Sequence, residues 1–189
     1  MSAPDPFRCA AFLVLAFRLA GVAQALWLRS ALSARLGVPL DGHRTLRGRR
    51  LLGDNKTWRG FVVMVPAVGA AFWLLHLLGV FGHLWPLSAG GYGLLGCWVG
   101  FGFMAGELPN SFLKRQLGIA PGAAPDHPLG RPVCFLLDRL DSLAGGCLAL
   151  GLVVRTPLLT WLYLLLVAPA IHWSFSLLLF HFGVKARPA

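Results

Sequence analysis

The sequence predicts an all-α, polytopic membrane protein of a single domain (residues 1–189), with about five transmembrane helices joined by cytoplasmic loops that carry its polar motifs. Three observations predict this fold class. Hydrophobic residues make up 57% of the chain, and the mean hydropathy is +0.68. Charged residues make up only 13%, about half of the share of roughly 25% that is usual in soluble domains. The hydrophobic residues fall in blocks of about 20, the length that a helix needs to cross a bilayer.

Five apolar blocks define the predicted helices. The first block resembles a signal peptide, with an A-x-A motif at 23–25. Arg18 interrupts it, however, and apolar sequence continues to Leu28, so we interpret it as a transmembrane helix. The third block is rich in glycine, which allows close helix packing. The predicted helices cover residues 7–28, 61–81, 92–105, 133–154 and 158–182.

The distribution of basic residues predicts the orientation, because Lys and Arg concentrate in cytoplasmic loops. The basic loop (29–59) contains eight of the 17 Lys and Arg residues. We place this loop in the cytoplasm. The same side then holds four further bases in an acidic stretch (106–142) and two in the tail, Lys185 and Arg187. Arg8 and Arg155 then face out. We therefore predict an inner-membrane protein with its N-terminus outside and its polar motifs facing the cytoplasm.

The net charge of +10 is compatible with nucleic-acid binding, but its distribution is not typical of it. The bases lie in loops between hydrophobic blocks, which favours membrane lipids or a phosphate substrate as partners. No nucleic-acid partner is predicted. The four cysteines and the histidines show no metal-ligand spacing, so we predict packed thiols rather than zinc or disulfides.

Four of the seven acidic residues lie in the acidic stretch: Glu107, Asp126, Asp138 and Asp141. Asp138 and Asp141 are three apart, which places both carboxylates on one helix face. Such a pair can hold a hard divalent cation that takes substrate phosphates as further ligands. With Arg139, three charges at mid-bilayer would cost roughly 8–10 kcal/mol, so they lie at the interface or line a polar cavity. On spacing alone, a charged cluster that only anchors a helix end is an equal alternative.

Basic residues accompany these acids in two places. Lys114 and Arg115 can anchor a helix end, but beside a metal-holding pair they can also neutralise a bound triphosphate. In the segment G-D-N-K-T-W-R-G (53–60), Lys56 and Arg59 lie in a compact turn from which they can reach an anionic head group. P-loop spacing is absent. Glu107 is either a third acid near the metal or the partner of a nearby base.

The motifs resemble a known family. S-F-L-K-R (111–115), followed by L-D-R-L-D-S (137–142), resembles the signature of the CTP:phosphatidate cytidylyltransferases. The segments P-L-D (39–41), R-R-L-L-G-D-N-K-T-W-R-G (49–60) and I-H…G-V-K-A-R-P (171–188) are more similar to their small relatives, the CDP-archaeol synthases. The resemblance implies a five-helix membrane enzyme that uses Mg²⁺ and CTP to convert a lipid phosphate into a CDP-activated lipid, either CDP-archaeol-like or CDP-diacylglycerol-like, with release of pyrophosphate.

The resemblance also implies roles for individual residues. Asp138 and Asp141 would hold Mg²⁺ and the triphosphate, with Lys114 and Arg115 as the other catalytic residues. Glu107 stands where the family pattern has Asp and is a candidate third metal ligand. The residues expected to bind CTP and the lipid phosphate are Lys56, Arg59, Asp54, Asn55, Thr57 and Ser111. The loop before Phe135 lacks the H-G-G of the phosphatidate enzymes, which favours the archaeol-type branch.

Two other functions compete with this prediction. A CDP-alcohol phosphotransferase also uses acids with CDP-lipids, but its D-G-x-x-A-R pattern is absent. A small non-enzymatic transporter, or a structural relative of the family, would carry titratable acids spread through the depth of the membrane. Here the acids cluster at one predicted interface and bases accompany them.

Overall fold

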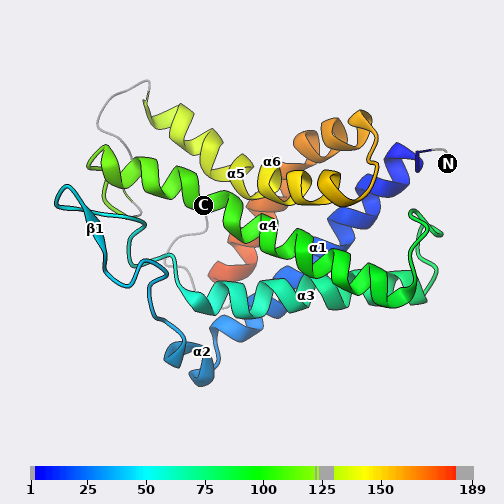
Figure 1. Ribbon diagram of the computed structural model, residues 1–189, viewed down its shortest axis with the longest axis horizontal. Coiled ribbons are helices and arrows are strands. Elements are labelled where there is room, and N and C mark those ends of the chain that lie inside the picture. The colour runs from blue at the N-terminus through cyan, green and yellow to red at the C-terminus, as the bar shows by residue number, and fades with distance from the viewer. Residues whose placement is uncertain (1–2, 122, 124–129, 182–189) are drawn as a thin grey trace.

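The computed structural model describes residues 3–121, 123 and 130–181, and most of them lie in helices (Figure 1). The long helices are α1 (Pro6–Leu28), α3 (Trp58–Leu77), α4 (Ala89–Gln116), α5 (Gly130–Val153) and α6 (Leu158–His181). Each overlaps one predicted apolar block, so the prediction of a mainly helical fold is confirmed. The predicted end of the second block at residue 81 is wrong, because α3 ends at Leu77 and the chain then turns through Gly79 and Phe81 with positive φ. Among the described residues, α1 and α3 are long and apolar enough to cross a membrane. Asp126, Phe182, Lys185 and Arg187 lie outside the described residues.

Helix α4 is longer than the sequence predicted. The apolar pattern predicted an end at residue 105, whereas the helix continues to Gln116, past Pro109. A proline inside a helix removes one backbone hydrogen bond, but here packing against a neighbouring helix retains the helical path. At its start, the Ser88 Oγ accepts a hydrogen bond from the Gly91 N–H at 3.2 Å. The extension places the first half of the acidic stretch on a rigid element.

The basic loop contains short elements that the all-α prediction missed. They are helix α2 (Ala31–Arg35) and an antiparallel pair of strands, β1 (Thr45–Leu46) and β2 (Arg49–Arg50). The turn between the strands has positive φ at both central residues, Arg47 (53°) and Gly48 (76°), which is the geometry of a type I′ hairpin. Strands of two residues are too short to give an alternating pattern in the sequence.

Helix α4 packs against α3 on one side and α5 on the other, while α1 contacts α3 and α6 (Figure 1). The α3–α4 contact is close because small residues face each other. A Cβ added to Gly96 would lie 2.7 Å from the Val68 carbonyl oxygen and 2.8 Å from the Gly69 Cα. Glycine at such crossings lets two backbones approach, as is common between membrane helices.

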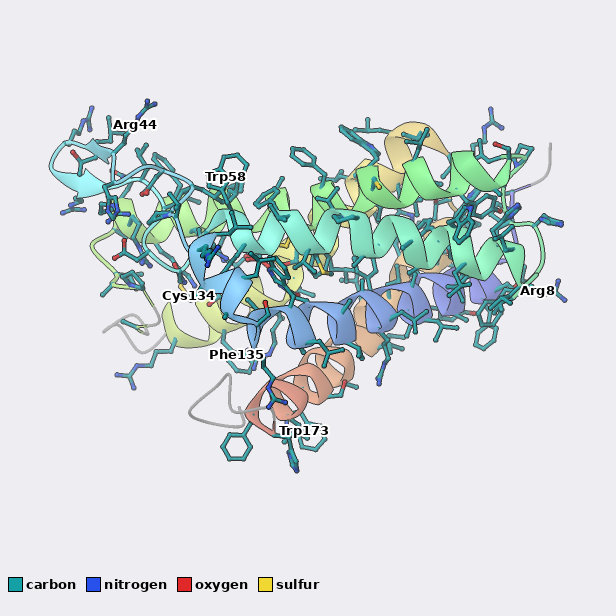
Figure 2. The ribbon with its side chains drawn as sticks, turned by 90° about the horizontal axis from the view of Figure 1, so that it is seen from below. Arg8, Arg44, Trp58, Cys134, Phe135 and Trp173 are labelled. Atoms are coloured by element: carbon teal, nitrogen blue, oxygen red, sulfur yellow. The ribbon has the colours of Figure 1, made fainter. Side chains whose placement is uncertain are left out.

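The two ends of the molecule differ in character. The β1–β2 hairpin lies at one end and the α3–α4 turn at the other (Figure 1). Arg44, near the hairpin, and Arg8, at the start of α1, also lie at opposite ends (Figure 2). Near the α3–α4 turn, Phe12, Trp85 and Tyr92 are buried together with edge-to-face ring contacts. The described acids of the acidic stretch, Glu107, Asp138 and Asp141, lie toward the hairpin end of α4.

Candidate active site

The candidate site forms where α4 crosses α5, and glycines set the distance between them. A Cβ on Gly106 would lie 2.9 Å from the Gly145 Cα, and one on Gly145 would lie 2.6 Å from the Gly106 Cα. Only glycine fits this crossing without moving a backbone. The contact brings Glu107 and Asn110 of α4 against the acids of α5.

Asp138 and Asp141 share one hydrogen-bond donor. The Asn110 Nδ2 donates to Asp138 Oδ1 at 2.7 Å and to Asp141 Oδ2 at 2.9 Å, so the two carboxylates lie on the same face, as their spacing predicted. The Lys114 ammonium forms an ion pair with Asp138 Oδ1. Asp138 is half-exposed, which leaves oxygen atoms of the pair accessible from the cavity.

Glu107 is engaged by a base and a hydroxyl. Its Oε2 forms an ion pair with the Lys56 ammonium, and its Oε1 accepts a hydrogen bond from the Ser142 Oγ at 2.7 Å. The Ser142 N–H donates to Asp141 Oδ1 at 2.6 Å, which links Glu107 to the acid pair. The ion pair with Lys56 corresponds to the second role predicted for Glu107, that of the partner of a base. The contact also fastens the basic loop to the crossing of α4 and α5.

The residues present fit a magnesium ion. In the described part of the chain, no three His, Cys, Asp or Glu side chains group together as metal ligands. Mg²⁺, however, is usually bound by one or two carboxylates together with waters and substrate phosphates. The paired oxygens of Asp138 and Asp141 meet that requirement without a third acid.

Arg115 is a largely buried cation that is attracted by Asp138 but lacks hydrogen-bond partners, among the described residues, at two of its guanidinium nitrogen atoms. It is only 8% exposed, and its Nε and Nη1 atoms are buried with no hydrogen-bond partner among the described residues. It lies beneath Gly53, which has a φ of +101°, and a Cβ added there would lie 3.2 Å from Arg115 Nη1. Buried polar groups are nearly always paired, and an unpaired charge is costlier still. The guanidinium therefore needs an anionic ligand, and it lines the main cavity.

The main cavity, of about 580 Å³, changes character along its length. On α4 the lining residues run from Val99 to Arg115, about 24 Å along the helix, and change from apolar to charged. The lining residues of α5 change in the same direction, from the apolar Leu150 to the charged Asp138. Its polar lining includes Asn55, Lys56, Glu107, Ser111, Lys114, Arg115, Asp138, Asp141 and Ser142. Its apolar lining includes Leu13, Phe17, Val99, Phe103, Leu150 and Leu164.

Three predicted binding residues lie beside this cavity rather than in it. Thr57 and Arg59 line a smaller cavity of about 170 Å³, which shares Lys56 in its lining with the main one. Asp54 is not among the residues that line either cavity. Its exposed carboxylate accepts a hydrogen bond from Arg50 at 2.8 Å and lies 3.8 Å from the His43 ring.

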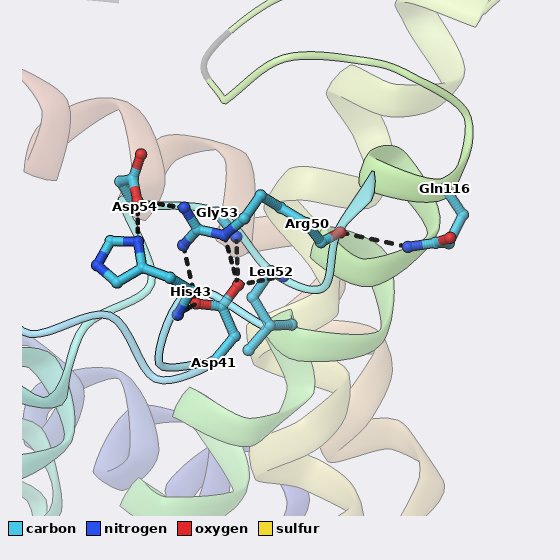
Figure 3. A network of polar contacts seen from close by, with 7 residues as sticks. All are labelled: Asp41, His43, Arg50, Leu52, Gly53, Asp54 and Gln116. Atoms are coloured by element: carbon cyan, nitrogen blue, oxygen red, sulfur yellow. Dashed lines mark hydrogen bonds and ion pairs between the residues drawn. The ribbon is translucent and has the colours of Figure 1, made fainter. Parts of the chain in front are cut away.

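Asp41 organises the basic loop (Figure 3). Its side chain is fully buried and pairs with the Arg50 guanidinium at 2.8 Å. Backbone N–H groups at three positions donate to the same carboxylate: His43, Leu52 and Gly53. Burial alone would raise the pKa of Asp41, but these hydrogen bonds outweigh it and hold the pKa well below its usual range. Pairing with Asp41 raises the pKa of Arg50 in turn.

The loop is also attached to the end of α4. The Gln116 Nε2 donates to the Arg50 carbonyl oxygen at 3.2 Å (Figure 3), and the Arg49 guanidinium donates to the Gln116 carbonyl oxygen. Through these contacts the segment that carries Gly53 and Lys56 covers Arg115.

Sequence reasoning missed Asn110, Ser142 and Asp41 as members of the site. Asn110 belongs to the same helical face as Glu107 and Lys114, at spacings of three and four residues. That pattern would have identified it if the helix had been extended past residue 105. Ser142 was quoted within a motif but given no role, and Asp41 shows no sequence spacing that points to Arg50.

Known proteins are similar to this chain in sequence and in fold. A family model described as CarS-like, CDP-archaeol synthase, matches residues 26–188. The CDP-archaeol synthase of Halobacterium salinarum is 35% identical over 174 residues, covering 84% of this chain and 87% of that protein. That of Methanopyrus kandleri is 36% identical over 156 residues, covering 80% of each chain.

A solved structure of an intramembrane enzyme for archaeal membrane lipid biosynthesis has a similar fold. The TM-score is 0.55 with 26% sequence identity, over 83% of this chain and 90% of that chain. Together with the apolar helices α1 and α3, this similarity identifies a membrane protein. From the family match and the identity to curated relatives, the chain belongs to the CarS-like CDP-archaeol synthase family.

Proposed function

We propose that this protein transfers the cytidylyl group of CTP to a lipid phosphate, forming a CDP-activated lipid and pyrophosphate in a magnesium-dependent reaction. The observation that carries the proposal is the main cavity. It joins Arg115, two of whose buried nitrogen atoms have no hydrogen-bond partner among the described residues, and an acid pair at one end to apolar walls at the other. The names of the curated relatives support the same chemistry.

The bases bind the triphosphate. Arg115 has two nitrogen atoms free for phosphate oxygens, and a guanidinium suits bidentate binding of phosphate. Lys114 and Lys56 lie beside it in the cavity, and their present carboxylate partners hold them in place until CTP arrives. Asn55 and Ser111 supply polar groups along the same wall. Together these side chains neutralise the charge of the nucleotide as it enters.

Asp138 and Asp141 are the residues that would hold Mg²⁺. When bound, the ion supplies charge neutralisation at the phosphates. Asn110 keeps the two carboxylates on a common face, and Ser142 orients Asp141 through its backbone N–H. Glu107 acts as the partner of Lys56 and carries no metal role in this proposal.

The reaction is an in-line displacement. An oxygen of the lipid phosphate attacks the α-phosphorus of CTP, the bond between that phosphorus and the α–β bridging oxygen breaks, and pyrophosphate leaves. The nucleophile is already an anion, so the chain needs no strong general base. Catalysis comes from positioning and from neutralisation of charge.

The apolar part of the cavity receives the lipid chains. Phe103 lies one helical turn before Glu107, and its ring centroid is 4.7 Å from that of Phe17 on α1. An acceptor with its phosphate near Arg115 therefore places its chains against aromatic and aliphatic side chains of α1, α4 and α5. Such walls suit isoprenoid and acyl chains alike, so the acceptor is either archaeol-like or diacylglycerol-like.

The remaining predicted residues act from the basic loop. Arg59 and Thr57, in the smaller cavity that shares Lys56, are placed to contact a head group at the membrane surface. Asp54 shapes the turn through Arg50.

We also propose the membrane arrangement. The helices α1, α3, α4, α5 and α6 each span the inner membrane, with the hairpin end in the cytoplasm, where CTP and magnesium are. The basic loop at the hairpin end contains eight of the 17 Lys and Arg residues, and this excess supports the orientation. Arg44 of that loop and Arg8 lie at opposite ends of the molecule (Figure 2).

The test is a transfer assay with purified protein in detergent, magnesium, labelled CTP and a panel of ester and isoprenoid-ether lipid phosphates. We expect labelled CDP-lipid that disappears when EDTA is added, and the best acceptor identifies the lipid. Absence of product with every acceptor, together with absence of CTP binding, would reject the proposal and leave a shared scaffold with a transport or structural role.

A further inference from the structure

Two histidines meet at the end of the molecule opposite the candidate active site. His76 lies in the last turn of α3, and His83 lies in the turn that leads to α4. Their Nδ1 atoms are 3.4 Å apart and their ring centroids 4.8 Å apart. This turn lies at the far end from the β1–β2 hairpin (Figure 1). The pair is therefore separate from Asp138, Asp141 and the CTP-binding bases.

The backbone between the two histidines is built to bring them together. Three residues of this turn have positive φ: Gly79 at 64°, Phe81 at 64° and Gly82 at 75°. A positive φ is unfavourable for Phe81, although glycine would adopt it without strain. Backbone strain of this kind concentrates at functional positions. The Gly79 N–H donates to the His76 carbonyl oxygen at 3.0 Å, so the chain reverses directly after the helix and returns His83 to His76.

The His76 ring is held in place by a rigid support. It stacks on the ring of Tyr92 with centroids 4.0 Å apart and an interplanar angle of 23°. Tyr92 is fully buried, and its hydroxyl accepts a hydrogen bond from the Trp85 N–H at 2.8 Å and donates to the Trp85 carbonyl oxygen at 3.2 Å. One member of the pair is thus pre-oriented, while the exposed His83 is free to adjust.

The distance between the two nitrogen atoms matches the separation of two ligands on one metal ion. Hydrogen bonds donated by N–H groups cluster at about 2.9–3.0 Å between heavy atoms, so 3.4 Å is long. Two nitrogen ligands at about 2.0–2.1 Å from a tetrahedral zinc ion lie about 3.3–3.4 Å from each other. We propose that His76 and His83 form, through their Nδ1 atoms, a binding site for a transition-metal cation of the Zn²⁺ class.

Imidazole nitrogen suits zinc, nickel and copper, whereas magnesium and calcium prefer oxygen ligands. In the part of the chain that the structure describes, no third His, Cys, Asp or Glu joins the pair. Water or a ligand from outside the chain therefore completes the coordination. Protons compete with the metal for the same nitrogen atoms, so binding strengthens as the imidazoles become neutral.

The test measures zinc binding by the full chain without a polyhistidine tag, in detergent at about pH 8, where imidazoles are neutral. After EDTA is removed, the protein competes with a chromogenic chelator for Zn²⁺. We expect one bound ion, an affinity at least about tenfold weaker in His76→Gln and in His83→Gln, and no displacement by excess Mg²⁺. His181→Gln, at an exposed histidine at the end of α6, is the matched control and is expected to bind as the unmodified chain does.

Folding is checked separately, because His76 contacts the core. The melting temperature in EDTA is expected to be the same for His83→Gln and the unmodified chain, since His83 is exposed. His83→Cys, which restores a zinc ligand, is expected to recover binding. The proposal is overturned if the unmodified chain binds no zinc, or if the His83→Gln variant binds it with unchanged affinity. Neither result depends on cytidylyltransferase activity.

Discussion

Gly106 and Gly145 are in backbone contact, and this contact sets the distance between the two helices that carry the acidic residues of the site. Next to this contact, Glu107 and Asn110 on α4 form the hydrogen bonds that join the helices, with Ser142 and Asp141 on α5. The geometry of the site therefore depends on two positions that have no side chain.

Gly145→Ala is expected to separate α4 from α5. The added Cβ would lie 2.6 Å from the Gly106 Cα, closer than real Cβ atoms come, so the backbone must move. Overpacking of this kind costs about 1–3 kcal/mol, and each kcal/mol lowers the melting temperature by about 2–4 °C in a chain of this size. We expect transferase activity to fall with it. Gly90→Ala is the control, because its nearest neighbour, the Ser88 Oγ, is 4.0 Å away. Full activity in Gly145→Ala would show that the crossing does not set the site.

Arg115→Met is expected to raise stability and remove nucleotide binding. Methionine replaces the apolar stem of the arginine and leaves no buried nitrogen atom without a hydrogen bond, which removes a penalty of about 1–3 kcal/mol. The measurements are the melting temperature without nucleotide and the affinity for CTP. Arg44→Met, at an exposed arginine near the hairpin, is expected to change neither. A lower melting temperature together with unchanged CTP affinity would contradict the phosphate-binding role.

Asp138→Asn and Asp141→Asn are each expected to reduce transfer by about 100-fold or more while the protein stays folded. Asparagine keeps the shape and can still accept the bond from Asn110, but it removes the negative charge that a magnesium ion needs. Activity should be followed across a magnesium titration, with folding checked by the melting temperature. Asp5→Asn is the control, since this exposed carboxylate only accepts the Arg8 N–H at the start of α1. Near-normal turnover in both active-site variants would contradict the proposal that Asp138 and Asp141 hold the magnesium ion.

Asp41 is expected to make stability depend on pH at the acidic end. Its pKa is lowered in the folded protein, so the folded state favours the carboxylate and the unfolded state binds a proton first. The stabilisation is complete above the unfolded pKa of about 3.9 and is lost as pH falls below it. Asp41→Asn should remove about 1.5–3 kcal/mol at neutral pH, the range for hydrogen bonds to a charged group.

The measurement for Asp41 is the melting temperature from neutral to acidic pH for both proteins. The two curves should converge as pH falls, since protonation and substitution remove the same charge. Parallel curves across that range would mean that the Asp41–Arg50 pair does not stabilise the fold.

The sequence predicted the long helices because each contains an apolar block, and four of the five predicted blocks are of bilayer length. It placed the end of α4 too early because Pro109 and the charged residues after Ala105 interrupt the apolar pattern, while the contact that continues the helix is with α5. The hairpin was missed because strands of two residues leave no periodicity.

The candidate site was predictable where chemistry follows local spacing and not where it follows tertiary contacts. Asp138 and Asp141 share a helix face by their spacing alone. The partners of Asp41 lie up to twelve residues away and depend on a turn with positive φ at Arg47 and Gly48. His76 and His83, seven residues apart, meet only because the chain reverses between them.

The most direct test of cytidylyl transfer follows both halves of CTP in one reaction. CTP labelled at the α-phosphorus and CTP labelled at the γ-phosphorus are supplied in parallel, with magnesium and the preferred lipid phosphate. The account predicts that the α label enters the lipid fraction, that the γ label appears in pyrophosphate in equal amount, and that both stop without the lipid phosphate. Release of the γ label as single phosphate, with no label in the lipid, would contradict it.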